Sequence, residues 1–240
     1  MKILVTICAR GGSKGIPGKN IKLINGKPLI AYSIDLANKV KKKFGAQISI
    51  STDDIEIKSI VESFGIKSEY NRPIHLASDH AGKIDTIRDL LKFEEKIIQN
   101  EYDYILDLDV TSPLRNIDDI VNSFKIFESN KNAETLFSVN IASRNPYFNM
   151  VEQNKNGFFS LVKINSDGNV MTRQSAPKVY DLNASFYWYR RVFFNLDLKS
   201  PITEKSLIYE MPHVCFDLDH QIDFDFMEYL IVHNKIDFLL

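Results

Sequence analysis

Cysteine is scarce in this 240-residue chain: only Cys8 and Cys215 are present, and they lie far apart. Cys8 closes an apolar run and Cys215 lies beside a pair of aspartates, so we expect two reduced core residues and no disulfide. The five histidines show no zinc-ligand spacing with cysteine or with one another. No serine, histidine and aspartate arrangement of the acyl-transfer type can be built. The sequence therefore gives no support to a disulfide-stabilised scaffold, a zinc site or a serine hydrolase.

An excess of charge of one sign is also missing, since 30 lysines and arginines are balanced by 31 aspartates and glutamates. The net charge of -1 argues against a polyanionic partner such as nucleic acid. No apolar run approaches the roughly 18 residues that cross a bilayer, and the first residues lack the pattern of a secretory signal. We therefore expect a cytoplasmic protein with no nucleic-acid partner and no membrane partner.

Apolar residues make up 44% of the chain, which is enough to bury the core of one α/β domain. Predicted strands and helices alternate through much of the chain, and this alternation indicates a mostly parallel sheet flanked by helices. The predicted strands cover residues 3–7, 48–52, 66–70, 103–109, 135–141 and 184–190, and the predicted helices cover residues 29–42, 55–64, 83–98, 116–129 and a last segment ending near Val232.

A glycine-rich basic loop follows the first predicted strand. It runs over residues 8–20 and contains four glycines together with Arg10, Ser13 and Lys19. Glycines let the backbone approach a ligand closely, and the cations and hydroxyl suit phosphate oxygens. The loop lacks the spacing of a Walker A loop and of the dinucleotide fingerprint. It is therefore a candidate triphosphate site, with an ordinary basic surface turn as the alternative.

Aspartates follow two of the predicted strands. Asp53 and Asp54 come directly after one strand and are expected to cap the next helix. Asp109 ends the strand 103–109, where ligands bind in open α/β sheets. Asp107 lies on the same face but deeper, and a structural hydrogen-bonding role and a catalytic role are both open for it.

Two Asp-x-Asp pairs lie near the end of the chain. In an extended segment Asp217 and Asp219 point to the same side, and two carboxylates converging on one point suit Mg²⁺. Capping or a surface strand is the alternative for an isolated pair. Asp223 and Asp225 repeat the spacing at the start of the last predicted helix, where stabilisation of the first helical turn is favoured.

The alternating pattern breaks down between about residues 143 and 180. Asn156-Gly157 and Asp167-Gly168 separate short apolar segments, which predicts β-hairpins. We therefore expect a single domain, residues 1–240, with an insertion at about 143–180.

Residues 9–20 resemble the signature loop of the CMP-sialic acid synthetases, the cytidylyltransferases that activate nonulosonic acids. The resemblance continues, in chain order, through Arg72-Pro73 with Leu76–Asp79, through Thr111–Arg115, partly through the segment 173–183, and through Asp217-x-Asp219. It implies a Rossmann-like sheet of the nucleotide-diphospho-sugar transferase type. It also implies that the insertion is a β-hairpin dimerisation element, so a homodimer is expected.

The same resemblance implies the site. Arg10 and Lys19 would oppose the charge that develops on the phosphates, and Asp217 or Asp219 would accept a proton. The implied contacts are Ala9, Arg10, Gly11, Ser13, Lys19, Asn20, Arg72 and Ser78 for CTP, Asp109, Thr111, Ser112, Arg173 and Asn183 for the sugar acid, and Asp217 and Asp219 for Mg²⁺ or Mn²⁺.

The implied reaction transfers CMP from CTP to the anomeric hydroxyl of a nonulosonic acid, releasing pyrophosphate, for surface polysaccharide or glycoprotein glycan biosynthesis. The chain departs from the family pattern at Asp109, which replaces glutamine, at Asp181, which replaces arginine in some members, and at Ala184, which replaces glycine. These departures leave neuraminic, legionaminic, pseudaminic and related acids open. A glycosyltransferase with a metal-binding Asp-x-Asp and a non-catalytic nucleotide-binding module are the alternatives.

Overall fold

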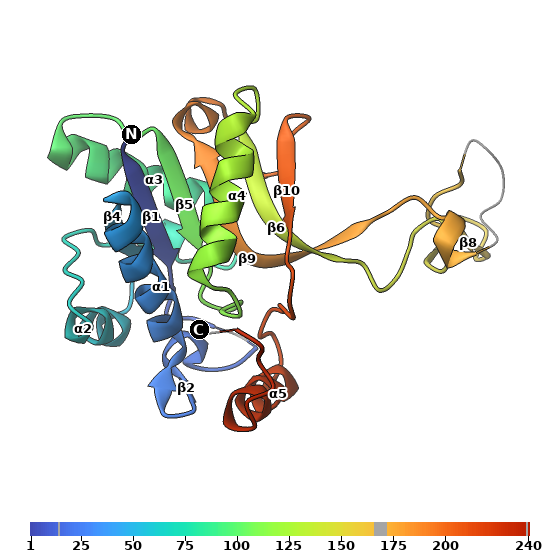
Figure 1. The fold of residues 1–240 in the computed structure, drawn as a ribbon, viewed down its shortest axis with the longest axis horizontal. Helices are drawn as coiled ribbons and strands as arrows, with labels where there is room; N and C mark the ends of the chain where they lie inside the picture. The colour runs from blue at the N-terminus through green and yellow to red at the C-terminus, as the bar shows by residue number, and fades with distance from the viewer. Residues whose placement is uncertain (14, 166–171, 239) are drawn as a thin grey trace. The chain divides into compact units, whose positions relative to one another are not determined.

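The computed structural model describes residues 1–13, 15–165, 172–238 and 240, which fall into two compact units. The first unit comprises residues 1–138 and 183–240, and the second comprises residues 139–182. Figure 1 shows the chain coloured from blue at its first residue to red at its last. Most of the predicted site residues belong to the first unit.

The fold is built on a six-stranded sheet (Figure 1). Strand β1 pairs in parallel with β4 and with β5, whereas β9 runs antiparallel to β5. The predicted α/β class, a mostly parallel sheet flanked by helices, is confirmed. Across the sheet the strands are β10 (Ser206–Glu210), β6 (Thr135–Ile141), β9 (Tyr180–Arg190), β5 (Tyr104–Leu108), β1 (Ile3–Cys8) and β4 (Gln47–Ser51).

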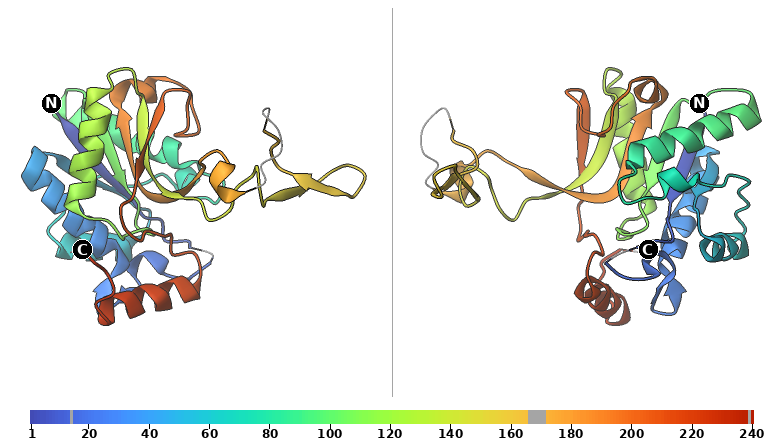
Figure 2. Two further views of the ribbon diagram at one scale, coloured as in Figure 1. Left: turned by 45° about the vertical axis from the view of Figure 1, so that its right-hand side comes forward. Right: turned by 180° about the vertical axis from the view of Figure 1, so that it is seen from behind.

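Side chains of β1 alternate between two apolar clusters on opposite faces of the sheet. Ile3, Val5 and Ile7 pack with α1, α2 and α4, whereas Leu4 packs with α3. Figure 2 shows α3 crossing the second face in the view from behind. Within the described ranges, every helix falls short of the length and hydrophobicity of a membrane span. The helices are α1 (Leu29–Phe44), α2 (Ile55–Ser63), α3 (Lys83–Ile98), α4 (Ile117–Ser129) and α5 (Gln221–Val232).

The strand predicted over residues 66–70 is wrong, because this segment forms no ladder in the described part of the chain. Its alternation has another cause: Ile66 and Tyr70 are buried, Ser68 donates to the carbonyl of Ile50, and the Tyr70 hydroxyl donates to Asp89. Apart from the hydrogen bond from the Ile66 N–H to the carbonyl of Val61 at 3.3 Å, the segment is held by these side-chain contacts. Three short strands were not predicted: β2 (Leu23–Ile24), β3 (Lys27–Pro28) and β10.

Two predicted helix caps are confirmed. Asp54 is the N-cap of α2, and its Oδ1 accepts from the backbone nitrogens of Glu56 and Ile57 at 2.8 and 3.1 Å. Asp223 stabilises the first turn of α5, where its Oδ2 accepts from the backbone nitrogens of Asp219 and His220 at 2.9 and 2.6 Å. The caps therefore fix the chain next to both the first loop and the Asp217–Asp219 pair.

The second unit contains the hairpin formed by β7 (Val151–Gln153) and β8 (Phe159–Leu161). Gly157 has a φ of 85°, a value that glycine adopts readily, at the turn predicted from the Asn-Gly pair. The second predicted turn, at residues 167–168, lies outside the described residues. Phe158 and Phe159 on the hairpin are 72% and 65% exposed. A role in dimerisation stays a prediction.

Candidate active site

Two adjoining pockets lie at the carboxyl ends of β1 and β5. We call the one of about 280 Å³ the Arg72 pocket and the one of about 320 Å³ the Lys19 pocket. Cys8, Arg10 and Asp109 line both, so the two pockets meet at these residues. Of the predicted site residues, the pockets bring together Arg10, Ser13, Lys19, Asn20, Arg72, Ser78, Asp109, Thr111 and Asp219.

A larger hollow of about 700 Å³ lies at the other end of the same strands, around Met1 and Tyr104. Its arginines are already bound: Arg190 donates to the carbonyls of Ala133 and Phe127, and Arg191 pairs with Glu95. Ligands of open α/β sheets bind beyond the carboxyl ends of the strands. The chemistry therefore belongs to the two smaller pockets.

The first loop is held by a hydrogen bond within the loop and by another to the segment just before α2. Buried Asn20 donates through Nδ2 to the carbonyl of Arg10 at 2.8 Å. Gly11 donates to Oδ1 of Asp53 at 3.2 Å, and a Cβ on Gly11 would lie 2.3 Å from Oδ2 of Asp54. A side chain at position 11 would therefore displace either the loop or the Asp54 side chain.

Lys19 joins this loop to the carboxylate segment. Its Nζ donates to the carbonyl of Leu218 at 2.9 Å and lies 3.3 Å from Oδ1 of Asp219. A Cβ on Gly15 would lie 3.1 Å from the carbonyl oxygen of Asp219. Leu218 in turn donates its backbone N–H to the carbonyl of Thr111 at 2.8 Å. The first loop, the end of β5 and the Asp-x-Asp segment thus form one site.

Asp217 has the features of a cation ligand. Its side chain is half-buried, and Oδ1 has no hydrogen-bond partner among the described residues. Burial raises the pKa of Asp217, and the nearby carboxylates of Asp109 and Asp219 raise it further. A buried acceptor without a donor, inside a group of negative charges, fits a divalent cation.

Mg²⁺ is usually bound by one or two carboxylates together with substrate phosphates. Across the ranges that the structure describes, no three His, Cys, Asp or Glu side chains are grouped so as to hold a metal by themselves. Asp217 and Asp219 match the first arrangement, in which phosphate oxygens complete the coordination. The residues present therefore fit the predicted Mg²⁺.

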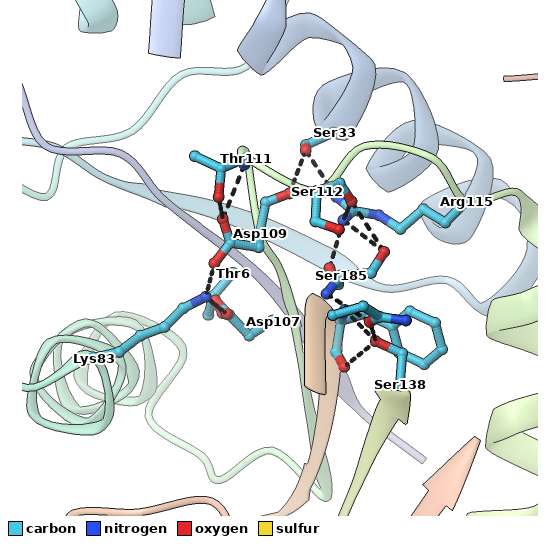
Figure 3. Close-up of polar contacts among 12 residues, drawn as sticks. Thr6, Ser33, Lys83, Asp107, Asp109, Thr111, Ser112, Arg115, Ser138 and Ser185 are labelled. Carbon is cyan, nitrogen blue, oxygen red and sulfur yellow. Dashed lines mark hydrogen bonds and ion pairs between the residues drawn. The ribbon is translucent and has the colours of Figure 1, made fainter. Parts of the chain in front are cut away.

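Asp109 is fixed where the two pockets meet (Figure 3). Its Oδ1 accepts from the backbone nitrogen and the hydroxyl of Thr111, both at 2.9 Å. Its carbonyl accepts from Ser33 at 2.9 Å and from Arg115 at 2.7 Å. Burial alone would raise the pKa of Asp109, but the Lys83 ammonium and the Thr111 hydrogen bonds outweigh it and lower the pKa to about 2. Asp109 is therefore an ionised acceptor.

Lys83 is a site residue that was not predicted. Its Nζ pairs with Oδ2 of Asp107 at 2.8 Å and with Oδ2 of Asp109. Asp107 is completely buried, and its Oδ1 accepts from the Thr6 hydroxyl at 2.8 Å. One signal was present in the sequence: a lysine at the first position of a helix opposes the helix dipole and needs a nearby anion.

Arg72 and Ser78 lie together in the Arg72 pocket, as the resemblance implied. The Arg72 side chain is buried and donates from Nε to the Ser51 hydroxyl at 2.9 Å and from Nη2 to the Ser51 carbonyl at 2.6 Å. Ser78 donates to the carbonyl of His75 at 3.1 Å. Their contact with cytosine stays a prediction.

Arg10 faces the same pocket from the first loop. Its Nη1 lies 2.9 Å from Oδ1 of Asp79 and donates to the carbonyl of Ala77 at 3.4 Å. Ala9, just before it, is buried and donates its N–H to the carbonyl of Ser51 at 2.9 Å. The first loop is therefore tied both to the segment around Ser78 and to the end of β4.

Three predicted sugar contacts, Ser112, Asn183 and Arg173, lie outside the linings of both pockets. Ser112 is buried, and its hydroxyl donates to the carbonyl of Phe216 at 3.1 Å. Asn183 is buried, and its Oδ1 accepts from the Ser138 hydroxyl at 2.6 Å. Arg173 belongs to the second unit, where Nη2 donates to the carbonyl of Ser143 at 2.5 Å. Sugar contacts by these residues stay predictions.

Arg115 organises the turn after β5, a role that was not predicted although the residue lies in a recognised motif. Nη1 donates to the carbonyls of Ser112 and Ser185, and Nη2 donates to the Ser33 hydroxyl and the Asp109 carbonyl (Figure 3). Nη1 also donates to the Ser185 hydroxyl at 3.2 Å, so five acceptors share one buried guanidinium. The backbone on either side of Asp109 is therefore set by the protein itself.

Ala184 has a φ of 56°, in the left-handed region that favours glycine. The resemblance implies glycine at this position, a residue that adopts this conformation without the steric cost that alanine bears. The neighbouring Ser185 donates its N–H to Oδ1 of Asn183 at 3.2 Å, and its carbonyl accepts from the N–H of Asp109 at 3.1 Å. The irregularity in β9 thus lies against the end of β5.

Residues 4–236 match a family model described as cytidylyltransferase. The chain is 42% identical over 236 residues to the post-translational flagellin modification protein B of Campylobacter coli, covering 98% of this chain and 97% of that protein. It is 41% identical over 231 residues to the CMP-N,N'-diacetyllegionaminic acid synthase of Campylobacter jejuni, covering 96% and 95%. The fold is similar to a solved CMP:2-keto-3-deoxy-manno-octonic acid synthetase complexed with CTP, with a TM-score of 0.67, 18% identity and coverage of 98% and 100%.

Proposed function

Because the chain belongs to the cytidylyltransferases, in the family of the CMP-sialic acid synthetases, we propose that it transfers CMP from CTP to the anomeric hydroxyl of a nonulosonic acid. The products are the CMP-sugar and pyrophosphate. One observation carries the proposal: Lys19 of the glycine-rich loop contacts Leu218 and Asp219 of the Asp-x-Asp segment. A triphosphate held by the loop would therefore lie next to the two carboxylates.

The chain's own residues act mainly by positioning and by charge. Arg10 and Lys19 present positive charge to the phosphates, and Arg72 and Ser78 hold the cytosine end of CTP. Mg²⁺ held by Asp217 and Asp219 would supply further positive charge to the phosphate oxygens. Asp217 or Asp219 accepts the proton of the attacking hydroxyl. The hydroxyl oxygen forms a bond to the α-phosphorus, and the bond from that phosphorus to the pyrophosphate breaks.

The sugar acid is proposed to be of the legionaminic type. A relative that matches nearly the whole chain is named for N,N'-diacetyllegionaminic acid, and another is named as a flagellin modification protein. Asp109 replaces the glutamine of the family pattern and presents an ionised carboxylate where the pockets meet. We further propose that the enzyme is cytoplasmic, that it is a homodimer formed through the insertion, and that its product serves glycan biosynthesis.

The test is an assay with CTP, Mg²⁺ and a panel of acids: N,N'-diacetyllegionaminic, pseudaminic, N-acetylneuraminic and Kdo. Pyrophosphate release and the CMP-sugar are followed by phosphorus NMR and mass spectrometry, with UTP and ATP as controls. We expect CMP-sugar from CTP alone and the highest kcat/KM with the legionaminic acid. Absence of a CMP-sugar with every nonulosonic acid would overturn the proposal. Sedimentation at several protein concentrations tests the dimer.

A further inference from the structure

Lys83 is the first residue of α3. Its ammonium lies between the carboxylate of Asp107, on β5, and that of Asp109, which directly follows β5 (Figure 3). It also lies 5.3 Å from the centroid of the Tyr187 ring and lines the Arg72 pocket. An ammonium at the start of a helix is electrostatically unfavourable unless anions lie close to it. Asp107 and Asp109 supply those anions.

Every polar atom of Asp109 except Oδ2 is held by a residue other than Lys83. Thr111 holds Oδ1, Ser33 and Arg115 hold the carbonyl, and the backbone N–H donates to Ser185. Oδ2 is bound by Lys83. The direction in which this oxygen faces the pockets therefore depends on the ammonium.

Asp107 plays a different part in the cluster. It is completely buried, and Thr6 occupies its Oδ1. Its other oxygen, Oδ2, lies 2.8 Å from Nζ of Lys83, so Asp107 anchors the ammonium. An unpaired buried carboxylate would destabilise the fold. Lys83 therefore also has a structural role, as the counter-ion of Asp107. An experiment has to separate the two roles.

We propose that Lys83 is a positioning residue of the transfer reaction: anchored on Asp107, it holds Oδ2 of Asp109 at the junction of the Arg72 and Lys19 pockets. The inference rests on the proposed function. Held in this way, Asp109 is a fixed acceptor for a hydroxyl group of the bound sugar acid. Displacement of a positioning group by about 1 Å can cost roughly 100-fold in rate, and that is the scale of effect expected here.

The decisive comparison is between Lys83→Met and the double variant Lys83→Met with Asp107→Asn. In the native cluster two carboxylates and one ammonium give a charge of -1, and in the double variant Asp109 alone gives the same charge. The double variant therefore removes the unpaired buried carboxylate without restoring the contact to Asp109. Urea unfolding should show a large loss of stability in the single variant and recovery in the double variant.

Kinetics with CTP and the best acid of the panel then decide. We expect kcat about 100-fold below native in both variants, with the KM for CTP unchanged, and partial recovery of kcat in Lys83→Arg, whose guanidinium can reach both carboxylates. Lys205→Met, which removes an exposed lysine paired with Glu134, is the matched control and should keep native kcat. Recovery of kcat in the double variant would make Lys83 only a counter-ion of Asp107 and overturn the proposal.

A raised KM for CTP with native kcat would make Lys83 a direct nucleotide contact and would also overturn it. The native enzyme serves as the separate check on the reaction itself. If it makes no CMP-sugar, the proposed function fails and the inference fails with it. If it does, only the ratio of variant to native kcat bears on Lys83.

Discussion

The Nζ of Lys19 lies 3.3 Å from Oδ1 of Asp219, although the two residues are 200 positions apart in the sequence. This contact joins the loop proposed to hold the triphosphate to the pair proposed to hold the metal. The exposed Asp219 side chain has little else around it, since 64% of it is accessible. Substitution of Asp219 should therefore lower the reaction rate more than it lowers the stability of the fold.

Asp219→Asn should lower kcat by about 100-fold or more, because one carboxylate of the metal pair and its charge are lost. The Kd for CTP, measured by calorimetry, should rise only modestly, since Lys19 and Arg10 remain. Asp225→Asn is the control, because Asp225 is exposed on α5 and accepts a hydrogen bond from Gln221. Native kcat in Asp219→Asn would remove this residue from the metal site.

Gly11→Ala should weaken CTP binding by about tenfold, equivalent to about 1.4 kcal/mol. The added methyl group would meet Oδ2 of Asp54 at 2.3 Å, so the loop or the Asp54 side chain must move. Adding Asp54→Ser should restore part of the affinity, because serine still caps the helix but lacks the second carboxylate oxygen. A Kd for Gly11→Ala equal to the native value would show that the loop tolerates the shift.

Ala184→Gly should stabilise the protein by up to about 1 kcal/mol, because glycine adopts the left-handed conformation without the cost that Ala184 bears. Urea unfolding measures the effect. The control is Ala37→Gly in the buried middle of α1, which should destabilise by at least about 1 kcal/mol, because helix propensity and a buried methyl group are both lost. If both substitutions destabilise equally, the conformation of Ala184 carries no strain.

Stability should fall with rising pH through the titration of His213. Its Nδ1 lies 3.1 Å from the carbonyl of Val214 and its Nε2 lies 3.0 Å from Oδ2 of Asp119, so both ring nitrogens face acceptors and the imidazolium fits. Burial opposes the charge, but the Asp119 hydrogen bond and the Val214 carbonyl outweigh it, and the pKa of His213 is raised above 6.5. A raised folded-state pKa adds stability that is full below the unfolded pKa and is lost as pH rises through the folded one.

The measurement is urea unfolding of the native chain and of His213→Gln at about pH 6 and about pH 8. The native chain should be more stable than the variant by a larger margin at the lower pH. An equal margin at both pH values would show that folding does not shift the pKa of His213, and a smaller margin at the lower pH would show that the folded protein keeps the ring neutral.

The parts of the fold that could be predicted are those in which pattern and local chemistry agree. Asp54 and Asp223 precede or begin apolar helical repeats, and both cap their helices in the structure. The alternation of residues 66–70 misled, because side chains that contact β4 and α3 produce the same period as a strand. Periodicity reports burial on one side and does not report backbone pairing.

The pockets could be predicted where a motif is continuous in the chain, as at Arg10, Lys19 and Arg72. Lys83 was missed because its partners, Asp107 and Asp109, come from a different element and are brought to it only by the packing of α3 on the sheet. Arg115 was missed for a related reason: it acts on backbone carbonyls, which leave no mark in the sequence.

Leu218 accepts a hydrogen bond from Lys19 and donates one to the carbonyl of Thr111, so the site depends on a segment that is synthesised late. During synthesis the first loop and the end of β5 emerge long before the segment that binds them, and domains fold as their chain becomes available. Until residue 218 has been made, Lys19 and Thr111 lack this partner, and the site cannot be complete.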